Sequence, residues 1–358
     1  MSHRVAILGG GIGAQHLDGY ISLGDRFTVT HICDLNPDVA QAQAARVPGA
    51  MVARNIAAIL ADPMVEVVDI CLPPGLHVAV TCDALAAGKH VICEKPLAGS
   101  VADVDKIRQA VAGSSGRKVF PVFQYRFGPR FAALDALGQA GLLGTPRVAS
   151  LETHWNRDAA YYATPWRGTW AHEMGGAVLS HAIHIHDLIS HCFGPVAEVS
   201  AMLGTMINPV ETEDCAAISL RMKNGALVTS SVTLGAADDT SRMRLVYEHM
   251  TVESGRLPYT PAEDTWTFTA RDPARQTAVD AIVRHTIGVT RPVGFAGFLA
   301  SVATSLEGCA PTSQAVMFED GASAIELVTA IYHADRTGQR AYLPLDRNLP
   351  ICQTLVHP

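Results

Sequence analysis

Short apolar runs alternate with helical periodicity through the first third of the chain. Continuous apolar runs of the length of a buried strand occupy residues 4–8, 27–33, 65–71, 90–93 and 119–123. Segments with helical patterning separate them, one ending near residue 24 and the others at 55–61, 77–87 and 100–112. Strands that alternate with helices predict right-handed βαβ units and a parallel sheet with helices on both faces. We therefore expect a doubly wound parallel-sheet domain over residues 1–123.

The pattern changes after residue 146. Strands are expected at 147–154, 198–203, 215–221, 226–233, 243–248 and 265–270, and helices at 178–192, 294–307 and 318–336. Asn224-Gly225, between two of these strands, is a strong hairpin signal. Consecutive strands without intervening helices indicate an antiparallel sheet. The sequence predicts a second α/β domain over residues 124–358, built on a large, mostly antiparallel sheet.

Composition narrows the classes of function. The chain has 358 residues, of which 48% are hydrophobic and 17% charged, an ordinary globular balance. Its net charge of −7 argues against a nucleic-acid-binding surface. No apolar run is long enough for a membrane span, and residues 1–4 lack a signal-peptide pattern. The eight cysteines form no CxxC pair, which is typical of free thiols in a reducing compartment, and we expect a cytoplasmic protein.

A glycine-rich turn follows the first expected strand. It has the pattern G-x-G-x-x-A, and its candidate ligand-binding residues are Gly9, Gly11, Ile12, Gly13 and Ala14. Glycines at a strand-to-helix turn allow a tight bend and let the backbone approach a pyrophosphate, which then sits on the helix N-terminus. The turn therefore predicts a dinucleotide site.

The second expected strand ends in Asp34, followed by Leu35. An acidic residue at this position can accept hydrogen bonds from the adenosine ribose hydroxyls and repels a 2′-phosphate. NAD is therefore favoured over NADP as the cofactor. An alternative is that Asp34 only caps a helix that starts at Asn36-Pro37.

The fourth expected strand, 90–93, is followed directly by Glu94, Lys95 and Pro96. In an open parallel sheet, ligands bind at the carboxyl ends of the strands. A lysine held there can hydrogen-bond a reacting oxygen, and Pro96 biases Lys95 towards an extended backbone. The alternative is a solvated Glu–Lys pair at a strand end. Further cofactor candidates follow other strand ends on the same edge, and they are Leu72, Pro73, Pro74, His77 and Gln124.

The expected helix 178–192 carries an unusual polar face. Ser180, His184, Asp187 and His191 lie opposite an apolar stripe, and this face contains no Lys or Glu. A helix buried on most sides with one face towards a cleft would have this pattern. There His184 can act as a general base near neutral pH, and Asp187 at i+3 can orient it. His181, His184 and His186 do not share a face, and we expect no metal site.

The segment 155–176 concentrates aromatic and basic side chains. It contains Trp155, Arg157, Tyr161, Tyr162, Trp166, Arg167, Trp170 and His172. Aromatic faces and arginines in one loop suit stacking on a sugar ring or holding a carboxylate or phosphate. An anchored surface loop or a subunit contact would have the same composition.

Taken together, these motifs resemble the Gfo/Idh/MocA family of oxidoreductases. The similar positions are the Gly9–Ala14 turn with His16, Asp34, Leu72-Pro73-Pro74 with His77, Gly88–Val91 leading into Glu94-Lys95-Pro96, Tyr125-Arg126, Gly175-Gly176 with Leu179, His184 and Asp187, and the tail Tyr342–Leu345. The resemblance implies a Rossmann domain followed by a substrate-binding domain whose sheet mediates homo-oligomerisation, as a dimer or tetramer. It also implies NAD(P)-dependent hydride transfer at a secondary alcohol of a sugar, polyol or inositol, with Lys95 and His184 at the reacting hydroxyl.

One position departs from the family pattern. Many members have an aspartate four residues before the catalytic histidine, where this chain has Ser180, followed by His181. A serine can hydrogen-bond a substrate hydroxyl but cannot share a proton as a carboxylate does. Two alternatives therefore remain. One is a reductase or dehydrogenase that acts on keto-sugars or dihydrodiols, and the other is a non-catalytic NAD-binding regulatory protein. The expected substrate contacts are Arg126, Trp155, Trp166, Arg167, His181 and Asp187.

Overall fold

The structure is a computed structural model that describes residues 2–310 and 312–356. It divides into two compact units. The first comprises the chain up to Gln124 together with Phe295–Ala322, and the second comprises Tyr125–Gly294 and the chain from Ser323 onwards. The first break lies one residue beyond the boundary that we expected from the sequence.

Phe295–Ala322 clusters with the first unit, whereas the sequence had led us to assign it to the second domain. Side-chain contacts with the first helix of the chain and with the turn that follows it explain this. The Phe295 ring lies 4.7 Å from the His16 ring, centroid to centroid, and Arg26 Nη2 lies 2.8 Å from Glu307 Oε1. Such contacts join residues almost 300 positions apart, so local patterning could not reveal them.

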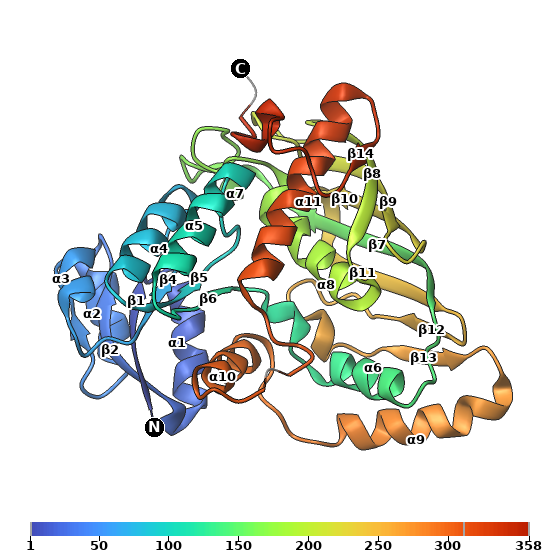
Figure 1. The fold of residues 1–358 in the computed structure, drawn as a ribbon, viewed down its shortest axis with the longest axis horizontal. Coiled ribbons are helices and arrows are strands. Elements are labelled where there is room, and N and C mark those ends of the chain that lie inside the picture. The colour runs from blue at the N-terminus through green and yellow to red at the C-terminus, as the bar shows by residue number, and fades with distance from the viewer. Residues whose placement is uncertain (1, 311, 357–358) are drawn as a thin grey trace. The chain divides into compact units, whose positions relative to one another are not determined.

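A six-stranded, all-parallel sheet forms the centre of the first unit (Figure 1). Its strand order is β3-β2-β1-β4-β5-β6. The strands are β1 (His3–Leu8), β2 (Phe27–Cys33), β3 (Met51–Val52), β4 (Val67–Ile70), β5 (His90–Cys93) and β6 (Val119–Pro121). The expected doubly wound architecture is confirmed. The sequence did not predict β3, because it is only two residues long and both are exposed.

Three helices of this unit begin at recognisable capping residues. Asn36, Asn55 and Ser100 each accept a hydrogen bond from a backbone N–H of the first turn, at 2.9–3.1 Å. The helices are α1 (Gly13–Ser22), α2 (Pro37–Ala44), α3 (Ile56–Ala61), α4 (His77–Ala86), α5 (Val101–Gly113) and α10 (Gly294–Leu306), whose first residue falls in the second unit. The cap of α2 is therefore Asn36 and not Asp34.

An eight-stranded sheet forms the centre of the second unit, in the order β13-β12-β11-β7-β10-β9-β8-β14. The strands are β7 (Pro146–Asn156), β8 (Val196–Gly204), β9 (Cys215–Met222), β10 (Leu227–Thr233), β11 (Gly235–Tyr247), β12 (Met250–Glu253), β13 (Thr267–Ala270) and β14 (Ala341–Tyr342). The β7–β10 pair is parallel and all other pairs are antiparallel, which confirms the expected mostly antiparallel sheet.

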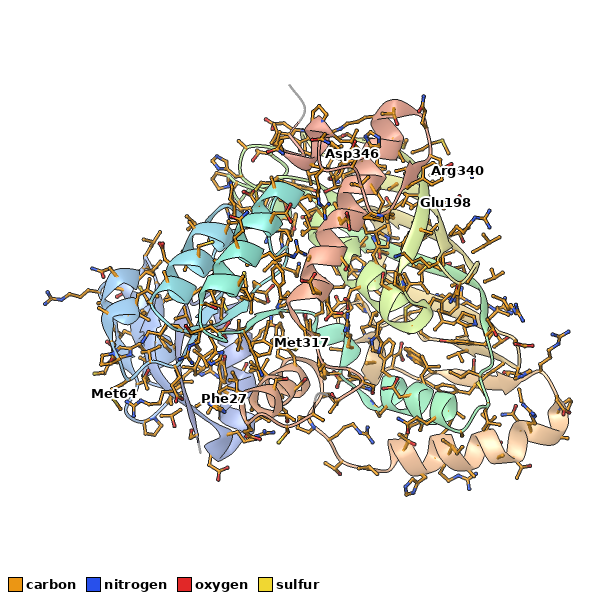
Figure 2. All side chains as sticks on the ribbon, viewed as in Figure 1. Phe27, Met64, Glu198, Met317, Arg340 and Asp346 are labelled. Atoms are coloured by element: carbon orange, nitrogen blue, oxygen red, sulfur yellow. The ribbon has the colours of Figure 1, made fainter. Side chains whose placement is uncertain are left out.

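Local contacts fix the turns and one edge of this sheet. Gly225 adopts a φ of +90° in the β9–β10 hairpin, beside Asn224, whose Oδ1 accepts from Ala226 N at 3.0 Å. At the edge, β14 pairs with β8, and Arg340 Nη1 donates to Glu198 Oε2 at 3.0 Å (Figure 2). Side chains along β9 and β10 alternate between buried and exposed, so one sheet face is buried and the other open.

The helices of the second unit include the one that carries His184. They are α6 (Pro129–Gln139), α7 (Ala159–Tyr162), α8 (Ile183–Phe193), α9 (Gln276–Ile287) and α11 (Phe318–Thr337), which starts in the first unit. The single helix expected at 178–192 begins instead as a π-helix, Val178–Ala182, which widens its first turn. In the described part of the chain, no helix is both long and apolar enough to span a membrane.

Candidate functional site

The glycine turn after β1 is shaped by close backbone approaches. Gly9 adopts a φ of +95°, and a Cβ there would lie 2.3 Å from the backbone oxygen of Cys71. A Cβ on Gly13 would lie 2.9 Å from Ile7 Cγ2, so this glycine lets α1 pack on β1. Gly11 is exposed, and no atom lies within 4 Å of its ideal Cβ position. The turn is tight on its inner side and open at Gly11, where a ligand can approach the backbone.

The start of α1 suits an anionic ligand. Ile12 precedes the helix as its N-cap, is 38% exposed and makes no side-chain cap. No acidic residue lies in the first turn, which includes Ala14. The N–H groups of an uncapped helix start favour negative charge. The residues of this turn therefore fit the pyrophosphate of a dinucleotide such as NAD.

Asp34 lies beside the glycine turn, at the end of β2. Its Oδ2 accepts from Gly10 N at 2.6 Å, and its Oδ1 accepts from Asn36 N at 2.8 Å. A carboxylate offers about four lone-pair sites, so these two bonds leave it able to accept from ribose hydroxyls as well. The next residue, Leu35, is fully exposed. Asp34 thus ties the turn to β2 while keeping its charge near the expected ribose position.

The segment after β4 is anchored through His77. The imidazole Nδ1 lies 2.7 Å from Pro96 O, and Nε2 lies 2.8 Å from Leu72 O. Burial lowers the pKa of His77, and the two carbonyl contacts oppose that effect. His77 is only 1% exposed, while Pro73 is exposed and Pro74 half-buried. His77 therefore joins the two strand-end segments that carry cofactor candidates, and the prolines are the members that a ligand can reach.

Glu94 and Lys95 stand at the carboxyl end of β5, as expected. Glu94 Oε2 accepts from the backbone N–H of Lys95 at 3.0 Å, and Lys95 itself is half-buried. The Lys95–Pro96 peptide bond is cis. Gln124, at the far end of this edge, has a buried Oε1 with no hydrogen-bond partner among the described residues. An orphaned buried acceptor fits the N–H or O–H group of a bound ligand.

A buried polar cluster supports Glu94, and the sequence analysis did not identify it. His16 Nε2 lies 3.1 Å from Glu94 Oε1, and His16 Nδ1 lies 2.9 Å from Asp69 Oδ2. Tyr20 OH also donates to Asp69 Oδ2, at 2.8 Å. One atom each of His16, Asp69 and Cys71 lies within 4.8 Å of the others, and hydrogen bonds link these atoms. The available signal was Asp69, an acidic residue inside an apolar strand run.

In the second unit, His184 stacks on Tyr125, with ring centroids 4.2 Å apart and an interplanar angle of 13°. His184 is 3% exposed. Asp187, which we expected to orient it, gives both of its carboxylate oxygens to the Arg126 guanidinium, at 2.8 and 2.5 Å. The predicted substrate contacts Arg126 and Asp187 are thus brought together in a buried pair.

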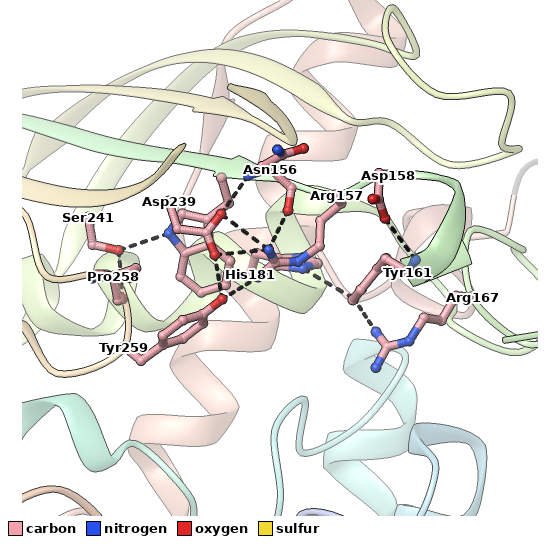
Figure 3. A network of polar contacts seen from close by, with 11 residues as sticks. Asn156, Arg157, Asp158, Tyr161, Arg167, His181, Asp239, Ser241, Pro258 and Tyr259 are labelled. Carbon is pink, nitrogen blue, oxygen red and sulfur yellow. Dashed lines mark hydrogen bonds and ion pairs between the residues drawn. The ribbon is translucent and has the colours of Figure 1, made fainter. Parts of the chain in front are cut away.

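Several of the predicted aromatic and basic residues of segment 155–176 form one network, and Figure 3 shows Arg157, Tyr161 and Arg167 within it. The Arg157 guanidinium lies over the Trp155 ring at 4.8 Å, and its Nη1 lies 3.0 Å from Asp239 Oδ2. Arg167 lies over Tyr161 at 4.0 Å and over Trp166 at 4.5 Å. Tyr161 OH lies 3.2 Å from His181 Nε2, so the network reaches the helix that carries Ser180 and His184.

A buried carboxylate that the sequence analysis missed caps the same helix. Glu213 Oε2 accepts from Gly176 N at 3.0 Å, and Glu213 Oε1 accepts from Val178 N at 2.9 Å. Tyr332 OH donates to Glu213 Oε2 at 2.7 Å. Burial raises the pKa of Glu213 to about 7 against these favourable contacts. Glu213 lies 35 residues beyond the helix start, so helix-capping patterns in the sequence could not reveal it.

Comparison with known proteins gives consistent matches. Residues 3–122 match the model of the oxidoreductase family with an NAD-binding Rossmann fold, and residues 131–253 match the GFO/IDH/MocA C-terminal domain. An inositol 2-dehydrogenase of Paenarthrobacter aurescens is 29% identical over 70% of this chain and 75% of its own length. An uncharacterized oxidoreductase of Synechocystis is 30% identical over 50% of this chain and 51% of its own, so this chain spans about half the length of that relative.

Solved structures agree with the fold over nearly the whole chain. The WlbA dehydrogenase from Bordetella pertussis, in complex with NADH and UDP-GlcNAcA, is 29% identical with a TM-score of 0.81. That similarity covers 96% of this chain and 99% of the WlbA chain. The two family matches together cover most of the sequence, and the protein therefore belongs to the Gfo/Idh/MocA family of oxidoreductases.

Proposed function

We propose that the protein is an NAD-dependent oxidoreductase that transfers a hydride between nicotinamide and a secondary alcohol of a sugar, polyol or inositol. The observation that carries the proposal is the open glycine turn at Gly11, with Asp34 hydrogen-bonded to Gly10 beside it. Relatives support the substrate class, since they include inositol 2-dehydrogenases and a levoglucosan dehydrogenase. The WlbA structure holds a nucleotide sugar acid together with NADH.

We assign the following roles in cofactor binding and catalysis to residues of this chain. The backbone at Gly11 and the start of α1 hold the pyrophosphate, and Asp34 accepts from the ribose hydroxyls. Bound NAD supplies the hydride acceptor. Lys95 Nζ donates a hydrogen bond to the reacting oxygen and stabilises the negative charge that develops there. His184 accepts the hydroxyl proton during oxidation and returns it during reduction.

The test is NADH formation by the purified protein with NAD and a panel of inositols, aldoses and sugar acids, run in both directions. We expect turnover with at least one class of polyol, and His184→Ala should lower kcat by ~10²–10⁴-fold. His191→Ala, on the same helix and half-buried, is the control and should keep kcat within a few-fold. Unchanged turnover in His184→Ala would exclude this histidine as the base.

The cofactor preference has a separate test at Asp34. Replacing Asp34 with Asn removes the charge that repels a 2′-phosphate and weakens the contact with Gly10. We expect the ratio of Kd for NADP to Kd for NAD to fall by roughly 10-fold, as measured by quenching of intrinsic fluorescence. An unchanged ratio would place the determinant of NAD preference elsewhere.

The same experiments separate the two alternatives. A keto-sugar reductase or a dihydrodiol dehydrogenase would turn over its own substrates once these are added to the panel, and Lys95→Met and His184→Ala would still lower that turnover strongly. A regulatory protein would bind NAD without substrate-dependent NADH formation. The observation that supports the regulatory alternative is Ser180, which stands where many family members have an aspartate.

Self-association is proposed to use the open face of the eight-stranded sheet. A hollow on β7–β10 is lined mostly by small side chains, including Ser150, Ser200, Ala217, Ser219 and Thr229, together with Glu152 and Met202. An exposed sheet face of this kind suits packing against a second copy of the chain. Ser219→Arg should shift the molar mass measured by light scattering from oligomer to monomer. A monomeric wild type would refute the proposal.

A further inference from the structure

Two arginines of segment 155–176 lie over the same aromatic ring but differ in their ion pairs. The Arg157 guanidinium lies 5.1 Å from the centroid of the Tyr161 ring, and the Arg167 guanidinium lies 4.0 Å from it. Arg157 is neutralised, because its Nη1 lies 3.0 Å from Asp239 Oδ2. No carboxylate of the described residues forms an ion pair with Arg167. Within the described part of the chain, the positive charge of Arg167 thus has no counter-charge.

The side chain of Arg167 is held by contacts that leave its charge in place. Its guanidinium lies over the Tyr161 ring and over the Trp166 ring, and its Nη1 donates to Tyr161 OH (Figure 3). Burial, opposed by Arg167, raises the pKa of Tyr161 to about 12. The phenol is therefore neutral near pH 7 and does not balance the arginine.

The guanidinium has donors to spare for a ligand. An arginine carries five N–H groups, and the bond to Tyr161 uses one of them. A guanidinium that stacks on aromatic faces keeps its N–H groups in its own plane, where they match two oxygens of a carboxylate or a phosphate. Arg167 is half-buried, so a ligand can reach this edge.

The backbone on both sides of Arg167 is fixed before a ligand arrives. Arg167 N donates to Thr164 O at 3.0 Å. Gly168, with a φ of +69°, donates from its N to Glu173 Oε2 at 2.6 Å. Earlier in the segment, Asp158 Oδ1 accepts from two backbone N–H groups at the start of α7, at 3.0 and 3.1 Å. A charged group that is already held in position loses less entropy when it binds a ligand.

This arginine also contacts the helix that carries the proposed base. Tyr161 OH, which accepts from Arg167, lies 3.2 Å from His181 Nε2. His181 lies on the π-helix that leads into α8, the helix of His184. Arg167 is therefore linked to the candidate substrate site through a single side chain, Tyr161.

We propose that Arg167 binds an anionic group of the substrate through two of its N–H groups, so that the preferred substrate is a sugar that carries a carboxylate or a phosphate. This inference rests on the proposed function for its reaction and adds a charge to the substrate class. A carboxylate and a phosphate share the chemistry that the guanidinium recognises, since each offers two oxygens side by side. A neutral sugar leaves the charge of Arg167 without a partner and should bind more weakly.

The first arm of the test measures binding and needs no turnover. The protein with excess NAD is titrated calorimetrically with D-glucose, D-glucuronate and D-glucose 6-phosphate, and with the same three forms of D-galactose and D-mannose. We expect at least one acid or phosphate to bind roughly 10- to 100-fold more tightly than its neutral parent. The tighter of the two anionic forms identifies the group that Arg167 binds. The proposal fails if no anionic form binds more tightly than its parent.

Two variants of Arg167 assign this preference to its side chain. Arg167→Gln removes the charge and should reduce the preference to a few-fold. Arg167→Lys keeps the charge without the two-point geometry, and should retain only part of the preference. Arg284→Gln, which removes an exposed arginine from α9 in the same unit, is the matched control and should bind like the wild type. An unchanged preference in either Arg167 variant overturns the proposal.

The second arm measures turnover of the same sugars. Arg167→Gln should raise KM for the preferred anionic substrate by roughly 10- to 100-fold and keep kcat within a few-fold, with little change for the neutral parent. An equal loss of kcat with charged and neutral substrates would indicate a structural role and overturn the proposal. Anion binding that depends on Arg167, without any NADH formation, would refute the proposed function and support the anion site. Best turnover with neutral polyols, unchanged in Arg167→Gln, would support the proposed function and refute the anion site.

Discussion

Arg126 and Asp187 form a two-point ion pair inside the second unit, through Nε to Oδ2 at 2.8 Å and Nη2 to Oδ1 at 2.5 Å. Both side chains are 3% exposed. A planar guanidinium that meets a carboxylate at two points is the favourable geometry for a buried pair. The two charges compensate each other inside this unit.

Breaking this pair should destabilise the protein. Arg126→Met leaves the Asp187 carboxylate buried without its guanidinium, and we expect a loss of about 3–5 kcal/mol in the free energy of unfolding. Urea denaturation followed by far-UV circular dichroism measures it. The double variant Arg126→Met/Asp187→Leu should recover much of the loss, because both charges of the pair are removed together. Single variants as stable as the wild type, but with a raised KM, would instead indicate substrate contact.

Sequence patterns predicted the helices and strands of this protein better than they predicted the contacts between them. The helix with His184 and Asp187 was expected because its polar face has a helical period. Its sequence could not show that Arg126, 61 residues earlier, binds Asp187. The parallel pairing of β7 with β10 was missed for a related reason, since a strand's own residues do not specify its neighbour.

Sequence motifs were sufficient to predict candidate site residues that lie next to the strand or helix that positions them. The turn Gly9–Ala14, Asp34 and the strand end at Lys95 are adjacent in sequence to the elements that position them, and the structure places them as expected relative to β1, β2 and β5. Glu213 and His16 were not identified as supports, because each acts on residues 35 or more positions away.

Gly9 and Gly11 should respond in opposite ways to the same substitution. Gly9 has a φ of +95° and its Cβ would collide with Cys71 O, so Gly9→Ala should cost roughly 3 kcal/mol of stability. Gly11 has open space around its Cβ position, so Gly11→Ala should unfold within about 0.5 kcal/mol of the wild type. Its methyl group would occupy the ligand approach and weaken NAD binding. Thermal unfolding and NAD titration of both variants test the pair, and normal NAD affinity in Gly11→Ala would contradict it.

His16 should stabilise the first unit in a pH-dependent way. Burial disfavours its charged form, but the Asp69 carboxylate outweighs burial and raises the pKa of His16 well above 6.5. Its folded-state charge therefore contributes stability that is complete below the unfolded pKa and is lost as the pH rises through the folded one. His16→Leu should cost about 3–5 kcal/mol near neutral pH, because two buried carboxylates lose their shared partner.

Denaturation midpoints over a pH series measure this effect. The stability gap between wild type and His16→Leu should narrow as the pH rises above 6.5 through the raised folded-state pKa of His16, where the wild-type imidazolium loses its proton. His249→Leu is a matched control in the second unit, where the half-buried imidazole lies outside the cluster. A gap that stays constant over this range would show that His16 is neutral in the folded protein.

Glu213 should make the stability of the second unit fall as the pH rises towards neutrality. Burial raises its pKa to about 7, opposed by donors at Tyr332, Val178 and Gly176, whereas an unfolded glutamate titrates near 4.5. Between these values the folded protein holds a proton that the unfolded chain has released, so stability decreases with increasing pH and levels off above about pH 7. Glu213→Gln cannot ionise and should lack this slope. Relative to Glu213→Gln, the wild type should lose roughly 3 kcal/mol between about pH 5 and about pH 8. The exposed Glu211→Gln serves as the control, and parallel pH profiles for wild type and Glu213→Gln would show that the Glu213 carboxylate is already ionised at pH 5.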